Sequence, residues 1–311
     1  MVHVLLGGTG TLGQQLASLI LSETEDRVRI LARGEHRLNE MRRLFNDDRL
    51  SFFVGDVRDY PRLRLALTGA DRVFHLAALK HVHTCEYDVL EAVKTNIEGT
   101  ANVLRACLEA GVKQAVLVST DKAVEPTTTY GATKMVAERI FLNGNSYSGR
   151  NSTVFFVVRY GNVLASQGSV LKIWKHQAEN GEALTVVNPE MTRFWWRPED
   201  AARFVLDSMA YGRPGDIYVP IMASCSLSDL AEAVAPGAEC RHISGMDHEK
   251  LHEDLLSNFE LEQATVMNER VIRVSMQSGP PAGEERFRLR LSSNDNPFGG
   301  VEELRPILEA M

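Results

Sequence analysis

The sequence predicts an α/β fold, in which a doubly wound parallel sheet is joined by a smaller, interleaved portion toward the C-terminus. Three observations support this prediction. Short β-branched or apolar runs alternate with longer amphipathic segments through the first half of the chain. A glycine-rich run directly follows the first apolar segment. The chain has 311 residues, of which 44% are hydrophobic, so it can bury a full core.

The expected strands of the first half are short apolar runs that suit burial on both faces of a sheet. They are Val2–Leu6, Val28–Leu31, Leu50–Val54, Val73–Leu76, Ala115–Val118 and Val154–Val158. The expected helices between them have apolar positions three and four residues apart. They are Leu12–Leu21, His36–Phe45, Val89–Ala110 and Tyr130–Phe141. Residues 1–160 are therefore expected to form one domain around this sheet.

Beyond Tyr160 the alternation loosens, and glycine and proline punctuate the chain. Residues 161–311 are therefore expected to be mainly a substrate-binding portion, with 199–220 returning to the first domain. The elements expected in this half are a helix at Glu199–Ala210, a strand at Asp216–Val219, strand-like stretches at Val271–Ser275 and Phe287–Leu291, and a helix at Val301–Met311.

Composition excludes several classes of partner. The chain has 34 Lys and Arg against 41 Asp and Glu, a net charge of -7, which argues against general affinity for nucleic acid or anionic membrane. Four cysteines without a CxxC pair fit reduced thiols better than a disulfide framework or a metal site. The first apolar run ends at Gly7, too early for a signal peptide, and no apolar stretch of membrane-spanning length follows. We expect a cytoplasmic protein.

The glycine-rich run ends the first expected strand and opens the first expected helix. Glycines there permit a tight turn and let backbone N–H groups approach a pyrophosphate at the positive end of the helix. A plain glycine-rich turn is the alternative, and the position after a strand argues against it. This context is that of the dinucleotide fingerprint of a Rossmann-type domain. The cofactor-binding residues expected here are Gly7, Thr9, Gly10, Thr11, Leu12 and Gly13.

The end of the second expected strand favours NADP over NAD. An NAD site usually has an acidic residue there, which binds the ribose 2′-hydroxyl. This chain has Arg33 instead, with Arg37 one turn further on, and a guanidinium suits a 2′-phosphate. The alternative is that both arginines are solvated residues at a helix start, with Glu35 close by. Asp56 and Val57, after the third strand, are expected beside the adenine by analogy of fold.

The segment after the fifth expected strand contains a tyrosine and a lysine in a pattern that predicts acid–base chemistry. Tyr130 and Lys134 are four apart on an expected helix, so they share a face. An ammonium beside a phenol favours the phenolate, which can remove a proton from a sugar hydroxyl as hydride leaves. The alternative is an unrelated Tyr and Lys on the surface, which the glycine fingerprint upstream disfavours.

Over nearly its whole length the sequence resembles the extended short-chain dehydrogenases that dehydrate UDP-N-acetylglucosamine, and especially the C5-inverting 4,6-dehydratases of pseudaminic acid synthesis. Tyr130 favours this branch, since related dehydratases, including the large membrane-bound ones, often have methionine there. The segments that carry the resemblance are Ser119–Lys134, Ala78–Val82 with Lys94–Asn96, Arg159–Leu164, Pro189–Phe194 and Glu249–Glu253.

The resemblance implies a three-step reaction. NADP+ oxidises the hydroxyl at carbon 4, with Tyr130 as base, Lys134 as its electrostatic support and Thr120 bonded to the carbon 4 oxygen. Lys122 then removes the proton on carbon 5 while Asp121 protonates the departing carbon 6 hydroxyl, and hydride returns to carbon 6. An acid and a base on neighbouring carbons suit this chemistry. Without the resemblance, the Asp121–Lys122 pair could equally be a surface ion pair.

The resemblance also implies the contacts to cofactor and substrate. Ala77, Ala78 and Lys80 are expected at the cofactor, together with Tyr130 and Lys134. The substrate residues implied are Lys80, His81, Tyr160, Asn162, Val163, Thr192, Arg193 and Glu249, on a UDP-sugar. Arg193 could grip phosphate oxygens in a bidentate manner, and its alternative is a structural salt bridge. Family members are usually dimers or hexamers, so a homo-oligomer is expected.

Two features of the sequence point elsewhere. His248–His252 matches the HExxH zinc-protease signature, and His81, His83 and Cys85 alternate as metal ligands could, but no further ligands stand at suitable spacing and no metal is expected. Met246–His248 replaces an Arg-Pro-Gly run of the family whose arginine helps to bind the nucleotide, which leaves the nucleotide sugar open. The alternatives to a 4,6-dehydratase are an epimerase or 5,6-dehydratase of the same fold, and then a non-catalytic NADP-sensing protein.

Overall fold

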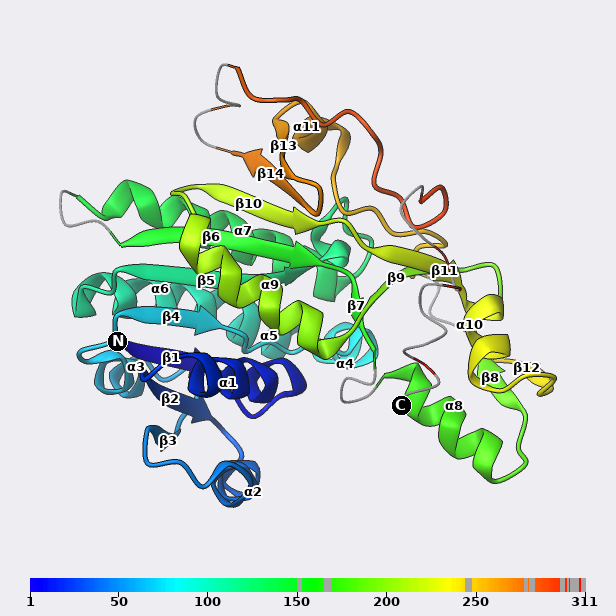
Figure 1. Cartoon of the computed structure of the whole chain (residues 1–311), viewed down its shortest axis with the longest axis horizontal. Coiled ribbons are helices and arrows are strands. Elements are labelled where there is room, and N and C mark those ends of the chain that lie inside the picture. Colours follow the sequence, from blue (N-terminus) through cyan, green and yellow to red (C-terminus); the bar gives the residue numbers. More distant parts are fainter. Residues whose placement is uncertain are drawn as a thin grey trace.

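A nine-stranded sheet runs through the centre of the computed structural model (Figure 1), in the order β13-β14-β10-β6-β5-β4-β1-β2-β3. The structure describes residues 1–149, 153–164, 169–243, 248–276, 279, 283–296, 300, 302 and 308. The strands are β1 (Val2–Leu6), β2 (Arg27–Ala32), β3 (Leu50–Val54), β4 (Arg72–His75), β5 (Gln114–Thr120), β6 (Val154–Tyr160), β10 (Asp216–Pro220), β13 (Ala264–Asn268) and β14 (Val271–Ser275).

The parallel part of this sheet extends from β3 to β10, and β14 and β13 continue it in the antiparallel direction. All six strands expected in the first half are present, as are those expected at Asp216–Val219 and Val271–Ser275. Their runs are apolar because helices cover both faces of the sheet. The α/β fold class is therefore confirmed, whereas the assignment of 161–311 to substrate binding stays a prediction.

Helices pack on the two faces of the sheet in two groups, which makes the sheet doubly wound (Figure 1). Helices α1 and α9 contact each other on one face, and α3, α6 and α7 pack together on the other. Their bounds, with that of α2 beside β3, are α1 (Thr11–Glu23), α2 (Glu35–Phe45), α3 (Tyr60–Leu67), α6 (Gly99–Ala110), α7 (Thr129–Tyr147) and α9 (Pro198–Tyr211). Within the described residues, no helix has both the length and the apolar character needed to cross a bilayer.

One sequence prediction about an element is confirmed with a refinement, and another is wrong. Val89–Ala110 is helical throughout, but a π-helical turn, η1 (Val93–Glu98), lies inside it between α5 (Val89–Ala92) and α6. Phe287–Leu291 is described throughout and forms no strand, because only Arg286 and Ser292 at its flanks make isolated bridges. Apolar and charged residues alternate in this stretch as in a strand, but Leu289 is exposed whereas Phe287 and Leu291 are buried. The helix expected at Val301–Met311 lies almost entirely outside the described residues.

A smaller assembly lies beyond the carboxyl ends of the parallel strands (Figure 1). It has one sheet of order β11-β9-β7, a second of β12 and β8, and an apolar core that includes Leu171, Trp174 and Leu230. Parallel α/β sheets bind ligands at this edge, so the assembly lies where a substrate would meet the sheet. Its elements are β7 (Asn162–Val163), α8 (Val170–Glu179), β8 (Leu184–Val186), β9 (Thr192–Trp196), β11 (Ala223–Ser226), α10 (Leu227–Val234) and β12 (Cys240–His242).

Candidate active site

The glycine-rich loop between β1 and α1 has the shape of a phosphate cradle. Gly7 has a φ of +83°, and a Cβ there would lie 2.8 Å from the Cα of Ala77. A Cβ on Gly13 would lie 2.4 Å from the carbonyl oxygen of Gly8. In the described part of the chain no side chain caps α1 at Gly10, and its first turn has no acidic residue. The positive end of the helix therefore suits an anion such as a pyrophosphate.

The residues around the end of β2 carry positive charge. Arg33 follows β2, its side chain is 57% exposed, and its Nη1 lies 3.9 Å from Asp56 Oδ2. Arg58 also pairs with Asp56 at 2.7 Å, and these guanidinium groups hold the pKa of Asp56 below its usual range although burial alone would raise it. Arg37 is exposed on α2, and Val57 is buried against Gly99. The preference for a cofactor with a 2′-phosphate stays a prediction.

The catalytic loop expected after β5 packs tightly on the start of α7. Asp121–Ala123 forms a short 3-10 helix, η2, and Thr128 caps α7 by accepting a hydrogen bond from the Gly131 N–H at 3.1 Å. A Cβ on Gly131 would lie 2.2 Å from the Lys122 carbonyl oxygen. Glycine at this position therefore lets η2 approach the helix that carries Tyr130.

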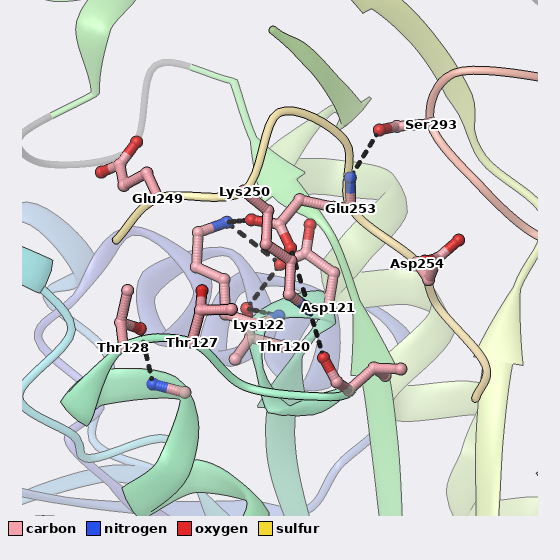
Figure 2. Close-up of polar contacts among 12 residues, drawn as sticks. Thr120, Asp121, Lys122, Thr127, Thr128, Glu249, Lys250, Glu253, Asp254 and Ser293 are labelled. Atoms are coloured by element: carbon pink, nitrogen blue, oxygen red, sulfur yellow. Dashed lines mark hydrogen bonds and ion pairs between the residues drawn. The ribbon is translucent and has the colours of Figure 1, made fainter. Parts of the chain in front are cut away.

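Asp121 and Lys122 form a buried ion pair rather than a surface pair (Figure 2). Asp121 has no exposed surface, and its Oδ1 accepts hydrogen bonds from Thr120 Oγ1 at 2.9 Å and from Lys122 Nζ at 3.1 Å. Lys122 Nζ also lies 3.4 Å from Asn162 Oδ1 and 3.4 Å from Glu253 Oε1. Burial lowers the pKa of Lys122, but the two carboxylates raise it more, so the ammonium form is favoured.

Tyr130 lies beside this pair at the first turn of α7. Burial raises the pKa of its phenol to about 12, while the Lys122 charge and a hydrogen bond with Thr120 act in the opposite direction. Lys134 is also buried, donates to the Val118 carbonyl oxygen at 2.8 Å, and has its pKa lowered to about 8 by burial. The Lys122 charge therefore lowers the pKa of Tyr130 in this site, and the role of Lys134 as electrostatic support of Tyr130 stays a prediction.

Arg193 on β9 is buried, and its contacts are structural. Its Nη1 donates to the carbonyl oxygens of Thr192 at 2.8 Å and Leu251 at 3.2 Å, and its Nη2 lies 3.4 Å from Glu249 Oε2. Thr192 Oγ1 in turn contacts His252 Nδ1 at 2.9 Å. The guanidinium thus fixes the segment that contains Glu249, and its grip on a diphosphate stays a prediction.

The loop after β4 is held against α7 by one buried amide. Asn96, in the π-helical turn, accepts from the Leu79 N–H at 2.8 Å and donates to the Leu79 carbonyl at 2.9 Å and to Thr133 Oγ1 at 3.0 Å. Lys80 and His81 follow in this loop and are exposed, and His81 precedes α4 (Val82–Tyr87). Ala77 and Ala78 are half-buried beside the glycine loop.

Tyr160 and Val163 complete the residues expected from the sequence. Tyr160 ends β6, is buried, and stacks edge-on with Trp196 at 5.9 Å between ring centroids. Val163 pairs with Trp196 in the sheet that joins β7 to β9. Both therefore lie where the central sheet meets the smaller assembly, beside Asn162 and its contact with Lys122.

The segment 248–253 lies over the catalytic loop and closes a small pocket. Thr127 Oγ1 donates to the His248 carbonyl at 2.6 Å, and Lys250 Nζ donates to the Val124 carbonyl. The residues that line the pocket are Val82, Lys122, Thr127, Thr128, Glu249, Lys250 and Glu253. Sequence reasoning missed Glu253, which stood in a segment noted only for its family resemblance.

The HExxH match does not have the geometry of a zinc site. Zinc proteases place both histidines on one face of a helix, with the glutamate between them. Residues 248–252 are described and form turns and bends, not a helix. His252 directs Nδ1 to Thr192, whereas His248 contributes its backbone carbonyl to Thr127. Met246 and Asp247, where the chain departs from the family pattern, lie outside the described residues.

The fold and the Tyr130–Lys134 pair are those of the extended short-chain dehydrogenase/reductase class. Residues 4–275 match the family described as polysaccharide biosynthesis protein, and the chain belongs to this family. It is 36% identical to the UDP-N-acetylglucosamine 4,6-dehydratase (inverting) of Campylobacter jejuni subsp. jejuni, an alignment that covers 98% of this chain and 96% of that protein.

Two further comparisons agree with this family. A UDP-glucose 4-epimerase of Rickettsia canadensis is 36% identical, over 84% of this chain and 79% of that protein. The X-ray structure of Pen from Bacillus thuringiensis has a TM-score of 0.92 at 32% identity, and the match covers 100% of this chain and 98% of that one.

Proposed function

We propose that this protein is an NADP-dependent nucleotide-sugar 4,6-dehydratase, a hydro-lyase that converts UDP-N-acetylglucosamine to a UDP-4-keto-6-deoxy-hexosamine. The observation that carries the proposal is the buried Asp121–Lys122 pair beside Tyr130, because dehydration needs an acid and a base in addition to the base that serves oxidation. The likeness to a relative named as such a dehydratase supports it.

The first step is oxidation at carbon 4. Tyr130 accepts the proton of the carbon 4 hydroxyl, and Thr120 donates a hydrogen bond to the same oxygen. Lys122 and Lys134 provide the positive charge that makes the phenolate accessible from a pKa of about 12. When bound, NADP+ would supply the hydride acceptor at carbon 4 and, in its reduced form, the hydride donor at carbon 6. The glycine loop and Arg33 are the residues that would hold it.

The second step is loss of water across carbons 5 and 6. The carbon 4 ketone acidifies the carbon 5 proton, which Lys122 removes, and Asp121 protonates the hydroxyl that leaves carbon 6. The two side chains already share a hydrogen bond of 3.1 Å, so one proton moved from Lys122 to Asp121 creates both the base and the acid. The Lys122 ammonium then returns a proton, exchanged with solvent, to carbon 5, and Tyr130 releases the proton that it took from the carbon 4 hydroxyl.

A second candidate is a nucleotide-sugar 4-epimerase, which the likeness to the Rickettsia relative favours. An epimerase reduces the same ketone without loss of water, so it needs no acid or base at carbons 5 and 6. The proposal is tested by incubating the protein with UDP-, dTDP- and GDP-sugars and measuring product mass. We expect loss of one water from UDP-N-acetylglucosamine and no net use of added NADP+. An unchanged mass with inverted carbon 4 would favour the epimerase, and no conversion of any nucleotide sugar would contradict both.

A further inference from the structure

The Lys122 ammonium has a second carboxylate that the proposed reaction does not use. Glu253 Oε1 lies 3.4 Å from Lys122 Nζ. Glu253 comes from the segment over the catalytic loop and is 3% exposed. Its backbone N–H donates to Ser293 Oγ at 2.8 Å, which fixes the residue from behind (Figure 2). A buried charge placed this close to a reacting group is expected to alter its protonation.

We propose that Glu253 is a positioning residue that holds Lys122 Nζ against Asp121 and, by its own ionisation, controls the transfer of a proton from Lys122 to Asp121. This inference rests on the proposed dehydratase function. In the resting site Lys122 is an ammonium and Asp121 a carboxylate. Transfer of one proton between them gives a neutral amine and a carboxylic acid. The amine then takes the carbon 5 proton, and the acid gives its proton to the departing hydroxyl, so water leaves and both residues return to their resting forms.

The charge on Glu253 decides how easily this transfer occurs. When Glu253 is ionised, Lys122 faces two carboxylates, and its raised pKa makes it a poor base. When Glu253 is protonated, one of these charges is removed and the ammonium gives up its proton more readily. Elimination should therefore slow as the pH rises through the pKa of Glu253.

The surroundings of Glu253 favour its protonation in an accessible pH range. Burial raises its pKa, as does Asp121, while Lys122, Arg193 and Lys250 lower it without cancelling the effect of burial. Lys250 Nζ is 3.9 Å from Glu253 Oε2, and that oxygen has no hydrogen bond within the described residues. Glu253 Oε2 can therefore take up a proton without breaking an existing hydrogen bond.

The test compares Glu253→Gln, Glu253→Ala and Asp254→Asn. The amide of the first variant can still accept a hydrogen bond from Lys122 but carries no charge. Asp254 is the matched control, because it is the next residue, points away from Lys122 and pairs with Arg290 at 2.9 Å (Figure 2). The measurement is deuterium incorporation at carbon 5 of UDP-N-acetylglucosamine product as a function of pH, with circular dichroism to verify folding.

In wild type we expect deuterium incorporation at carbon 5 to decrease at high pH. In Glu253→Gln we expect no such decrease. Glu253→Ala should be slower at every pH, on the order of 100-fold, because Lys122 is no longer held in place. Asp254→Asn should keep the wild-type profile. An active Glu253→Gln variant whose profile has the wild-type shape would overturn the proposal, since a purely structural role lowers the rate without changing its pH dependence.

A second measurement needs no sugar turnover. The pH dependence of acetylation of Lys122 by acetic anhydride, followed by peptide mass, reports the ionisation of its amine. We expect Lys122 in Glu253→Gln to be acetylated at lower pH than in wild type, and equal profiles would contradict the inference. If wild type dehydrates no sugar, the proposed function fails, while this measurement still decides whether Glu253 controls Lys122.

Discussion

At the scale of single residues, three groups define the candidate site, and the surroundings of each one displace its pKa. Burial raises that of Tyr130, two carboxylates raise that of Lys122 against burial, and burial lowers that of Lys134. The protonation states of these neighbouring groups are therefore expected to depend on one another.

Removing Lys122 should separate oxidation from elimination. In Lys122→Ala the carbon 5 base and one cation beside Tyr130 are absent, while Tyr130, Thr120 and Lys134 remain to support a slower oxidation of carbon 4. We expect dehydration to fall by about 10²–10⁴-fold, the usual contribution of a general base, and reduced cofactor to accumulate with bound sugar. Product mass and the near-ultraviolet absorbance of reduced nicotinamide measure the two steps. Dehydration at the wild-type rate would exclude Lys122 as the base and favour a reaction without elimination.

Replacing Arg33 should change the choice of cofactor. If its exposed guanidinium binds the 2′-phosphate, Arg33→Ala loses a charge-assisted contact worth about 1.5–3 kcal/mol, which is about tenfold to a hundredfold in NADP affinity. The affinity of Arg33→Ala for NAD should stay within about twofold of the wild-type value, because NAD has no 2′-phosphate for Arg33 to bind. Calorimetric titration with both cofactors provides the comparison. An equal loss for both, or none, would show that Arg33 does not read the phosphate.

Most residues of the site could be predicted from the sequence, but their pKa values and their partners in the folded chain could not. Asp121, Lys122, Tyr130 and Lys134 stand in one motif, so spacing and resemblance were sufficient to select them. Glu253 comes from a distant segment and approaches Lys122 only through the fold. The same holds for the pKa of each group, because burial and charged neighbours are properties of the folded chain.

At the scale of elements, close backbone contacts bring the loops of the site together. Gly131 admits η2 against α7, and a Cβ on Gly161 would lie 2.5 Å from Phe194 Cβ and 3.2 Å from Asp121 Oδ2. The π-helical turn η1 directs Asn96 toward the loop after β4. The sequence pattern predicted one continuous helix there, because a single extra residue in a helical turn leaves the apolar spacing almost unchanged.

Gly131→Ala should be destabilising although alanine favours helices. In an unhindered helix the exchange would stabilise by about 1 kcal/mol. Here the new Cβ would lie 2.2 Å from the Lys122 carbonyl, so η2 must move and take Asp121 and Lys122 out of position. We expect a lower melting temperature and a large loss of dehydration. Gly34→Ala is the control, since nothing lies within 4 Å of its added Cβ. A more stable, fully active Gly131→Ala would refute the packing argument.

The elements that sequence predicted best are the parallel strands, because burial on both faces gives unbroken apolar runs such as Phe155–Val158. Short elements of the second half, such as β7 and β9, were not predicted. These strands form because they pair with segments distant in the sequence, as Asn162 pairs with Trp195. The strand predicted at Phe287–Leu291 is wrong for the converse reason. Its pattern is that of a strand, but among the described residues only single backbone hydrogen bonds at its two ends, with Ala264 and Leu255, join it to other segments.

At the scale of the whole molecule, one buried ion cluster joins the central sheet to the chain that returns over the site. Arg159 on β6 binds Glu138 on α7 at 2.7 Å and Glu260 on α11 (Asn258–Leu261) at 2.8 Å. It also donates to the Leu255 carbonyl at 3.0 Å. The segment that carries Glu253 is therefore anchored, two residues further on, to the strand that leads to Tyr160.

Arg159→Met should destabilise the protein in a pH-dependent way. Burial raises the pKa of Glu260, but Arg159 lowers it to about 2 from a reference value of 4.5. A depressed carboxyl pKa stabilises the fold above the reference value, and this contribution is lost as the pH falls toward 2. Without Arg159, two buried carboxylates remain unpaired at neutral pH, which costs about 3–5 kcal/mol.

The loss of unfolding free energy in this variant should shrink as acid protonates Glu260. Urea unfolding at neutral pH and near pH 4.5 measures it. Arg203→Met is the control, because Arg203 forms an exposed pair with Glu23 between α9 and α1 and should matter by less than about 1 kcal/mol. A deficit for Arg159→Met that stays constant or grows in acid would mean that lost packing, not unpaired charge, dominates.

The central claim is that Asp121 and Lys122 eliminate water from a sugar that Tyr130 has helped to oxidise. A time course with UDP-N-acetylglucosamine in heavy water tests it most directly, with product mass and cofactor absorbance followed together. The account predicts loss of one water, deuterium at carbon 5 and no net change in NADP+. A product that keeps its oxygen, or one that forms without deuterium at carbon 5, would contradict it.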